Sequence, residues 1–332
     1  MNESKGSSRQ TPKGRSPGVS VILPILNEER FLEGAIKAIL AQRYDGPLEV
    51  ILALGPSRDR TNEIAMSLAR AETRVVIVEN PSGRTAAALN MAIAASQYGI
   101  ICRIDGHAEI SPSYISSAVR VLEQTQAVNV GGIMAARGIG EFERAVASAM
   151  RSPLGVGTAR FHTGGKAGAV DTVYLGVFDK AALLAAGGYD ERFTRAQDWE
   201  LNYRLRQAGG IIWFDPDLVV TYRPRPNLKA LSKQYFEYGR WRRAVIRTHK
   251  GTINLRYLAP PFTLVATALS LVLGATINTI FFLPAGIYLL GNLVGSFIIG
   301  KHLREKIMLP IILATMHFSW GMGFITSPRN LI

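Results

Sequence analysis

The fold is decided by the stretch Val19-Ser20-Val21-Ile22-Leu23-Pro24-Ile25-Leu26-Asn27-Glu28-Glu29. Its first half is an apolar run, which is typical of a strand that is buried on both faces of a parallel sheet. The run closes on polar residues, and apolar side chains then recur every three to four positions over residues 28–42, as in an amphipathic helix. We therefore predict a strand, a polar turn and a helix in this part of the chain.

The same alternation continues as far as residue 104. Further apolar runs predict strands at residues 48–54, 74–78 and 100–104, separated by predicted helices at residues 61–70 and 84–96. Strands separated by helices of this length indicate an α/β fold with a mainly parallel central sheet. Ligands of such sheets bind beyond the carboxyl ends of the strands, so the polar segments there form the candidate site. No Gly-x-Gly-x-x-Gly follows the first strand, which excludes the dinucleotide-binding fingerprint.

The positive charge of the chain is concentrated in one segment. The 332 residues carry a formal net charge of +13, which raises the question of nucleic-acid binding. Residues 19–222 nevertheless carry a net charge of −2, whereas residues 223–256 carry +9. Because the body is nearly neutral, we expect no nucleic-acid partner. The first 18 residues are rich in Ser, Gly, Lys and Arg and predict a disordered tail.

Residues 257–332 are predicted to form a membrane domain. No charged side chain occurs in residues 257–300, a run of 44 residues. As a helix this run is about 66 Å long, twice the thickness of a hydrocarbon core. We predict membrane spans at about residues 257–277, 280–300 and 307–326. Basic residues precede the first span and occur at 301–306, and such loops are usually cytoplasmic, so we place both of these segments on the cytoplasmic side. The sequence thus predicts a multi-pass protein of the cell membrane, with its body in the cytoplasm and its C-terminus outside.

Residues 223–256 are expected to contact membrane lipid at the bilayer surface. Between residues 228 and 246, aromatic and aliphatic side chains recur at three- and four-residue steps, with lysines and arginines between them. This pattern is typical of an amphipathic helix that lies among lipid headgroups. The alternative is a solvated helix that packs on the body.

Five short motifs follow one another along residues 19–222. They are Pro24-Ile25-Leu26-Asn27-Glu28-Glu29, Ser57-Arg58-Asp59-Arg60-Thr61, Asn80-Pro81-Ser82-Gly83-Arg84 leading to Asn90, Arg103-Ile104-Asp105-Gly106-His107-Ala108, and Gly187-Gly188-Tyr189-Asp190 with Gln197-Asp198-Trp199-Glu200-Leu201 and Arg204. In this order the set resembles the inverting family 2 glycosyltransferases of the GT-A type. It is most similar to the succinoglycan-biosynthesis glucosyltransferase branch. The resemblance implies an enzyme that uses a nucleoside-diphosphate sugar as its donor substrate.

The resemblance assigns a metal site to Asp105 and His107, which stand where the family has its Asp-x-Asp motif. In an extended segment, residues two apart project to the same side, so both side chains can reach one divalent metal ion. Mn²⁺ or Mg²⁺ there would offset the charge of the leaving diphosphate, and the histidine favours Mn²⁺. The alternative is an exposed strand end with an incidental histidine.

Asp198 matches the general base of the family, which takes the proton from the acceptor hydroxyl. The usual Glu-Asp pair is Gln197-Asp198 here, so the neighbouring acid is lost and the base is retained. The alternative for Asp198 is a charge that favours a helix N-terminus, and one residue can do both.

The resemblance also assigns donor binding to Pro24, Asn27, Glu28, Gly55 and Arg84. The alternatives are that Asn27 or Glu28 caps the following helix and that Arg84 is a surface residue. The family usually has Asp-Asp-Gly-Ser after the second strand, where this chain has Leu54-Gly55-Pro56-Ser57. The resemblance implies that the two acids help to hold the nucleobase and ribose in the family, and this chain has neither of them.

These observations predict a membrane-anchored inverting glycosyltransferase, which transfers a single sugar to a lipid-linked or polysaccharide acceptor at the cytoplasmic face. Single transfer is favoured because processive members carry Gln-x-x-Arg-Trp, whereas six residues separate Gln234 from Trp241 here. Two alternatives are a polyprenyl-phosphate sugar synthase, whose acceptor is the lipid phosphate itself, and a non-catalytic scaffold with the same fold.

Overall fold

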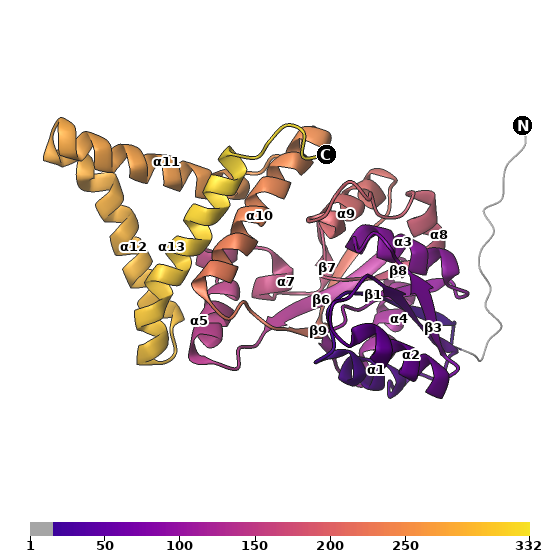
Figure 1. The fold of residues 1–332 in the computed structure, drawn as a ribbon. Coiled ribbons are helices and arrows are strands. Elements are labelled where there is room, and N and C mark those ends of the chain that lie inside the picture. The colour runs from indigo at the N-terminus through magenta and orange to yellow at the C-terminus, as the bar shows by residue number, and fades with distance from the viewer. Residues whose placement is uncertain (1–15) are drawn as a thin grey trace, which may run out of the picture.

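The computed structural model describes residues 16–332. Most of the predicted tail, residues 1–15, lies outside the described residues. The chain forms an α/β body and a group of long C-terminal helices beside it (Figure 1).

The first half of the body is the predicted alternation of strands and helices. Strands β1 (Val19–Ile25), β2 (Leu48–Leu54), β3 (Val75–Glu79) and β4 (Ile100–Arg103) alternate with helices α1 (Leu32–Leu40), α2 (Thr61–Ala71) and α3 (Thr85–Ala95). The four strands are parallel and lie in the order β3-β2-β1-β4. Because β1 lies between β2 and β4, the carboxyl ends of these three strands meet at one edge of the sheet.

The second half makes the sheet mixed. Strands β5 (Glu109–Ile110), β6 (Asn129–Ala136), β7 (Gly168–Ala169), β8 (Val177–Asp179) and β9 (Ile212–Tyr222) extend the order to β3-β2-β1-β4-β8-β6-β9-β5, with β7 on β9. The short β8 is antiparallel to both β4 and β6. The helices of this half are α4 (Tyr114–Thr125), α5 (Glu141–Met150), α6 (Pro153–Val156), α7 (Arg160–Thr163), α8 (Lys180–Ala185) and α9 (Gln197–Gln207).

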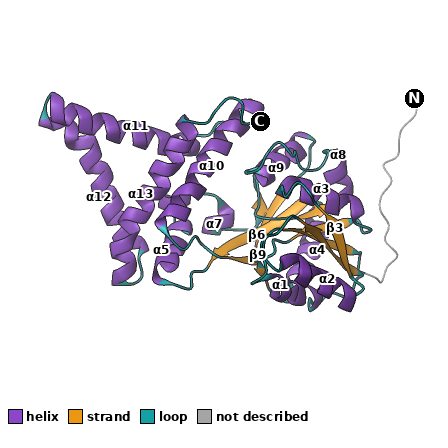
Figure 2. Ribbon diagram, in the orientation of Figure 1, coloured by secondary structure: helices purple, strands orange, loops and turns teal. Residues whose placement is uncertain are grey.

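Helices cover both faces of the sheet, as the buried strands require (Figure 2). One hydrophobic cluster packs Ile36 of α1 and Ile115 of α4 against the strands. The other packs Leu89 of α3 and Leu201 of α9 against the opposite face. The packing of Leu201 fixes α9 to the same sheet that carries the loops after β1, β2 and β4. Asp198 is in the first turn of α9.

Four long helices complete the chain. They are α10 (Leu228–Thr248), α11 (Leu255–Thr276), α12 (Leu283–Ile299) and α13 (Leu303–Ile325), and a 3-10 turn, Thr279–Phe282, precedes α12. Figure 1 shows α11, α12 and α13 as three sides of a triangle, with α13 beside α10. Three helical segments are long and apolar enough to cross a membrane, at Leu255–Thr276, Thr279–Ile299 and Leu303–Ile325. These segments overlap the three predicted spans, and the third begins four residues earlier than predicted.

Helices α10 and α13 are in close contact through two glycines. A Cβ atom on Gly239 of α10 would lie 2.0 Å from the carbonyl oxygen of Trp320, and one on Gly323 of α13 would lie 2.0 Å from that of Phe236. The apolar side chains Leu231 and Tyr235 of α10 are buried together with Leu309 and Ile312 of α13. A side of α10 that was expected to face lipid is therefore covered by protein.

Both ends of α13 contact the body or its extension α10. Near its start, Glu305 accepts a hydrogen bond from Ser148 of α5, at 3.2 Å. Beyond its end, Ser327 donates to the carbonyl of Arg240 at 2.9 Å, and Leu331 packs on a buried cluster that includes Phe193 and Trp199. The residues beyond α13 thus pack against the body and α10, whereas the sequence predicted a C-terminus across the membrane from the body.

Candidate active site

The loops after β1 and β2 are tied together at the carboxyl edge of the sheet. Asn27 adopts a left-handed backbone conformation, with φ of 57°. Its side-chain oxygen accepts from the backbone N–H of Arg58 at 2.8 Å, and its own N–H donates to the hydroxyl of Ser57 at 3.0 Å. The N–H of Glu28 donates to the Thr61 hydroxyl at 2.7 Å. Asn27 therefore joins two loops and does not cap α1, which begins at Leu32.

Pro24 and Gly55 fit the same edge for steric reasons. Strand β4 pairs with β1 only as far as Ile22, so Pro24, which has no N–H, lies where β1 lacks a partner on that side. Gly55 is buried, and a Cβ atom there would lie 3.2 Å from the carbonyl oxygen of Ile25 and 3.4 Å from Gly83. Arg84 follows Gly83 directly, precedes α3 and is exposed. Three loops thus converge on one small area.

The two residues assigned to a metal lie directly after β4. Asp105 and His107 are both half-buried, and Nδ1 of His107 lies 2.8 Å from the carboxylate of Glu28. The hydrogen bond to Glu28 raises the pKa of His107. A carboxylate on one ring nitrogen is the arrangement that orients metal-binding histidines, with the other nitrogen as the ligand.

These residues fit a cation that takes its remaining ligands from the substrate. Over residues 16–332, no group of three or more His, Cys, Asp or Glu side chains is arranged to hold a metal ion. Asp105 and His107 would therefore supply two ligands, and diphosphate oxygens and water the others. This division is ordinary for Mg²⁺ and its nucleotide complexes.

Arg103 joins the loop after β4 to α9. Its side chain is only 6% exposed, and its Nη2 lies 3.2 Å from Asp105. Its Nη1 contacts the carboxylate of Asp198. Burial opposes the charge on Arg103, but Asp198 and Asp105 hold the pKa of the guanidinium well above its usual value. The candidate metal ligand and the candidate base thus share one buried cation.

Asp198 has the chemistry of a base that works near neutral pH. Its side chain is one-quarter exposed. Burial raises the pKa of Asp198, Arg103 lowers it and Asp105 raises it, and together these effects leave the pKa at about 6. Such a carboxylate is ionised at pH 7 and is a stronger proton acceptor than an ordinary aspartate.

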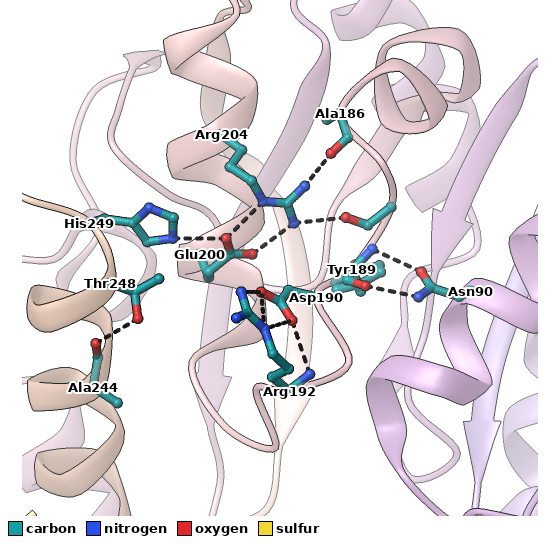
Figure 3. Close-up of polar contacts among 11 residues, drawn as sticks. Asn90, Ala186, Tyr189, Asp190, Arg192, Glu200, Arg204, Ala244, Thr248 and His249 are labelled. Atoms are coloured by element: carbon teal, nitrogen blue, oxygen red, sulfur yellow. Dashed lines mark hydrogen bonds and ion pairs between the residues drawn. The ribbon is translucent and has the colours of Figure 1, made fainter. Parts of the chain in front are cut away.

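A buried polar network holds the helix that carries Asp198 (Figure 3). Glu200 is only 1% exposed, and both of its oxygens accept from Arg204, each at 2.7 Å. Arg204 also donates to the carbonyl of Gly188 at 2.7 Å. Nε2 of His249, at the end of α10, lies 2.9 Å from Glu200. The network thus connects α9 both to the Gly187–Asp190 loop and to the segment that leads to α11.

The Gly187–Asp190 loop is fixed from its other side by Asn90 of α3. The side chain of Asn90 donates to the carbonyl of Tyr189 and accepts from its N–H, both at 2.8 Å (Figure 3). Gly188 has φ of 68°, and a Cβ atom there would lie 2.7 Å from the Asn90 oxygen. Motifs a hundred residues apart therefore meet beside Asp198.

Comparison with known proteins identifies the family. The family model for glycosyl transferase family 2 matches residues 20–184. The succinoglycan biosynthesis protein ExoA of Rhizobium meliloti (strain 1021) is 32% identical over 308 residues, which cover 92% of this chain and 93% of the relative. The chain belongs to glycosyltransferase family 2.

Two more distant proteins match over nearly the whole chain. A Methanococcus voltae protein is 26% identical over 92% of this chain and 95% of its own length. It is named dolichyl N-acetyl-alpha-D-glucosaminyl phosphate 3-beta-D-2,3-diacetamido-2,3-dideoxy-beta-D-glucuronosyltransferase. The solved structure of mannosyltransferase PcManGT from Pyrobaculum calidifontis, in complex with GDP-Man and Mn²⁺, superposes with a TM-score of 0.63 at 20% identity, over 92% of this chain and 89% of that one. This likeness shows that the glycosyltransferase has the GT-A fold.

The fold brings several of the predicted site residues close together. It also gives structural roles to Arg103 and Glu200, which the sequence did not predict. Asp105 and Asp198 both contact Arg103, and His107 contacts Glu28. Arg103 was not predicted as a site residue, although a charged residue that ends a buried four-residue strand is a usable signal. Glu200, two residues after Asp198 in the last motif, is engaged by Arg204 and His249.

Proposed function

We propose that this glycosyltransferase transfers a single sugar, with inversion, from a nucleoside-diphosphate sugar to a lipid-linked or polysaccharide acceptor at the cytoplasmic face of the membrane. The observation that carries the proposal is the pairing of Asp198 with Arg103 beside Asp105. It puts a carboxylate with a raised pKa next to the residues assigned to the donor diphosphate.

In the proposed reaction, Asp198 accepts the proton of the acceptor hydroxyl as that oxygen attacks the anomeric carbon of the donor. The bond from the anomeric carbon to the diphosphate oxygen breaks on the opposite face, which inverts the configuration. A divalent cation held by Asp105 and His107 would neutralise the charge that develops on the leaving nucleoside diphosphate. Arg103 keeps Asp198 ionised between turnovers, because the pair favours the carboxylate form.

Donor binding is proposed for the loops after β1 and β2 and the start of α3. Pro24, Asn27, Glu28 and Gly55 line the area where these loops converge. The exposed Arg84 is available for a phosphate oxygen, since no ion pair of its side chain is found over residues 16–332. A guanidinium is the side chain that best matches phosphate geometry.

The names of the relatives support the acceptor class. One relative is named for the biosynthesis of a polysaccharide, and the other for transfer to a dolichyl-linked sugar phosphate. Both cover more than nine-tenths of this chain, including its apolar helices. We infer an acceptor attached to a membrane lipid or to a growing polysaccharide.

For the membrane itself, we propose that α11 and α12 cross as a hairpin and that α13 stays on the side of the body. The contacts of Glu305 with Ser148 and of Leu331 with the Trp199 cluster support this arrangement. A helix whose two ends both touch the body has no end on the far side. The basic residues 223–256 favour the cytoplasm for that side.

The decisive experiment replaces the proposed base. Membranes that contain Asp198→Asn are incubated with a panel of labelled nucleotide-sugars, and the lipid and polysaccharide products are extracted. We expect loss of transfer, with binding of the nucleotide-sugar retained. Asp171→Asn is the matched control, because Asp171 is exposed and its carboxylate pairs with the surface Arg206 at 3.6 Å.

Each other outcome points to a named alternative. Wild-type transfer by Asp198→Asn onto a lipid phosphate would favour the polyprenyl-phosphate sugar synthase, which does not need to deprotonate a hydroxyl. Absence of nucleotide-sugar binding by the wild-type protein, measured by calorimetry with and without Mn²⁺, would favour the scaffold.

A further inference from the structure

Two arginines without acidic partners meet where the body joins the apolar helices. The guanidinium carbon of Arg242, in α10, lies 4.5 Å from the ring centre of Trp199 and 4.2 Å from that of Tyr257. Arg256, in the first turn of α11, lies 4.7 Å from the Tyr257 ring and donates to its hydroxyl at 2.5 Å. No salt bridge of either arginine is found in the described part of the chain.

This group of residues holds several buried donors that lack acceptors. Nη1 of Arg242, Nε of Arg256 and Nε1 of Trp199 are all buried and have no hydrogen-bond partner among residues 16–332. Burial lowers the pKa of Arg242 to about 10, and the charge of Arg256 acts in the same direction, although Tyr257 opposes it. Unpaired buried N–H groups are rare and cost free energy, so three in one group indicate a missing acceptor.

We propose that Arg242 and Arg256 bind the phosphate of a lipid-linked acceptor, with the indole N–H of Trp199 as a further donor. The proposal rests on the proposed function in one respect, namely that the acceptor is attached to a lipid. Guanidinium groups pair with phosphate oxygens through two hydrogen bonds at once. Trp199 directly follows Asp198 in α9, so a phosphate held here would keep the attached sugar near the base.

The burial of these arginines distinguishes the site from general attraction to anionic lipid. Lys229, Lys233 and Lys250 of the same segment are exposed, as expected for residues that attract a charged bilayer without recognising one molecule. Arg242 and Arg256 are instead half-buried against aromatic rings. Two adjacent cations suit a diphosphate, which carries more charge than the monoanionic headgroup of an ordinary phospholipid.

Direct binding tests the proposal without any sugar transfer. The full-length protein in phosphatidylcholine nanodiscs is titrated calorimetrically with farnesyl diphosphate, and farnesol serves as the uncharged control. Arg242→Gln and Arg256→Gln are each expected to weaken the binding of farnesyl diphosphate about 10-fold or more, the effect of one lost charged hydrogen bond. Arg243→Gln is the matched control, since Arg243 is the next residue and lies instead over Phe324 of α13, at 4.9 Å.

Two further measurements test whether the binding is specific for the diphosphate and for the arginine side chain. Nanodiscs that contain phosphatidylglycerol should not compete with farnesyl diphosphate, and Arg242→Lys should bind it more weakly than the wild type while unfolding at a similar temperature. Binding at the donor site does not confuse the result, because only loss specific to Arg242 and Arg256 supports the proposal. Equal loss in Arg243→Gln, unchanged affinity in the two variants, equal binding of farnesol, or displacement by phosphatidylglycerol would each overturn it.

Discussion

The guanidinium of Arg103 contacts the carboxylate of Asp198, which lies 95 residues further along the chain. The same guanidinium also contacts Asp105, two residues away. One buried cation therefore holds together the two carboxylates that are proposed to do the chemistry. The proposed base on α9 and the loop after β4 are thus electrostatically coupled through Arg103, and this coupling can be tested directly.

Replacement of Arg103 by glutamine should lower kcat about 100-fold, because Asp198 loses the charge that keeps it ionised and oriented. The loss should be larger at pH 6 than at pH 8, since the pKa of Asp198 rises further without the arginine. Initial rates with the identified donor at both pH values measure this effect. Arg206→Gln removes a partly exposed arginine from the same body and should retain activity; an equal rate for both variants would contradict the role of Arg103.

The pH dependence of kcat should show one acidic limb near pH 6. Asp198, with a pKa of about 6, is protonated and inactive as a base below that pH, and ionised above it. Since the folded-state pKa lies above the reference value of 3.8, this group favours folding at low pH, and its contribution falls as pH rises from about 4 to about 6. A flat rate profile between pH 5 and 8 would exclude Asp198 as the base.

Breaking the Glu200 network should unfold the protein at a lower temperature. Glu200→Gln leaves the half-buried Arg204 without its carboxylate, and loss of one partner of a fully buried pair costs about 3–5 kcal/mol, which is the upper bound here. Thermal unfolding followed by circular dichroism measures the change. Glu63→Gln is the control, because its pair with Arg60 is more than 70% exposed on both sides and should matter little. A melting temperature unchanged in Glu200→Gln would show that the network does not hold α9.

The position of the C-terminus can be tested with single cysteines. The native Cys102 is buried, so a membrane-impermeant maleimide applied to intact cells should leave the wild type unlabelled. Thr279→Cys, at the exposed turn between α11 and α12, should be labelled from outside. Ile332→Cys should be labelled only after the cells are opened. Labelling of Ile332→Cys in intact cells would instead support three complete crossings.

The sequence predicted the parallel half of the sheet well because each of its elements has a local period. Strand β2 has the bounds expected for it, and β1 and β4 differ only at their ends. The antiparallel β8 was not predicted, since three residues, Val177–Asp179, carry too little pattern and the partners β4 and β6 lie far away in sequence. Pairing of that kind depends on tertiary contacts.

The sequence predicted which loops form the candidate site, but it did not predict the contacts that join these loops to α9. Glu28, Asp105 and His107 lie near one another because parallel strands end at one edge. The link from Asp105 to Asp198 was not foreseeable. It runs through Arg103, the last residue of a buried strand, and the sequence does not show that this arginine contacts both carboxylates. Likewise, hydropathy shows that α13 avoids water, but it does not distinguish burial in lipid from burial against α10.

The anchoring of α13 at both ends has a consequence for the choice of acceptor. Because α13 is joined to α12 and is held by Ser148 near one end and by Arg240 beyond the other, we expect a fixed distance from Asp198 to α11 and α12, the two helices proposed to cross the membrane. A hydroxyl fastened to the bilayer through a chain of sugars reaches Asp198 only if that chain has the right length. The enzyme would then select its acceptor by the length of the sugar chain between lipid and hydroxyl, in addition to the shape of the sugar.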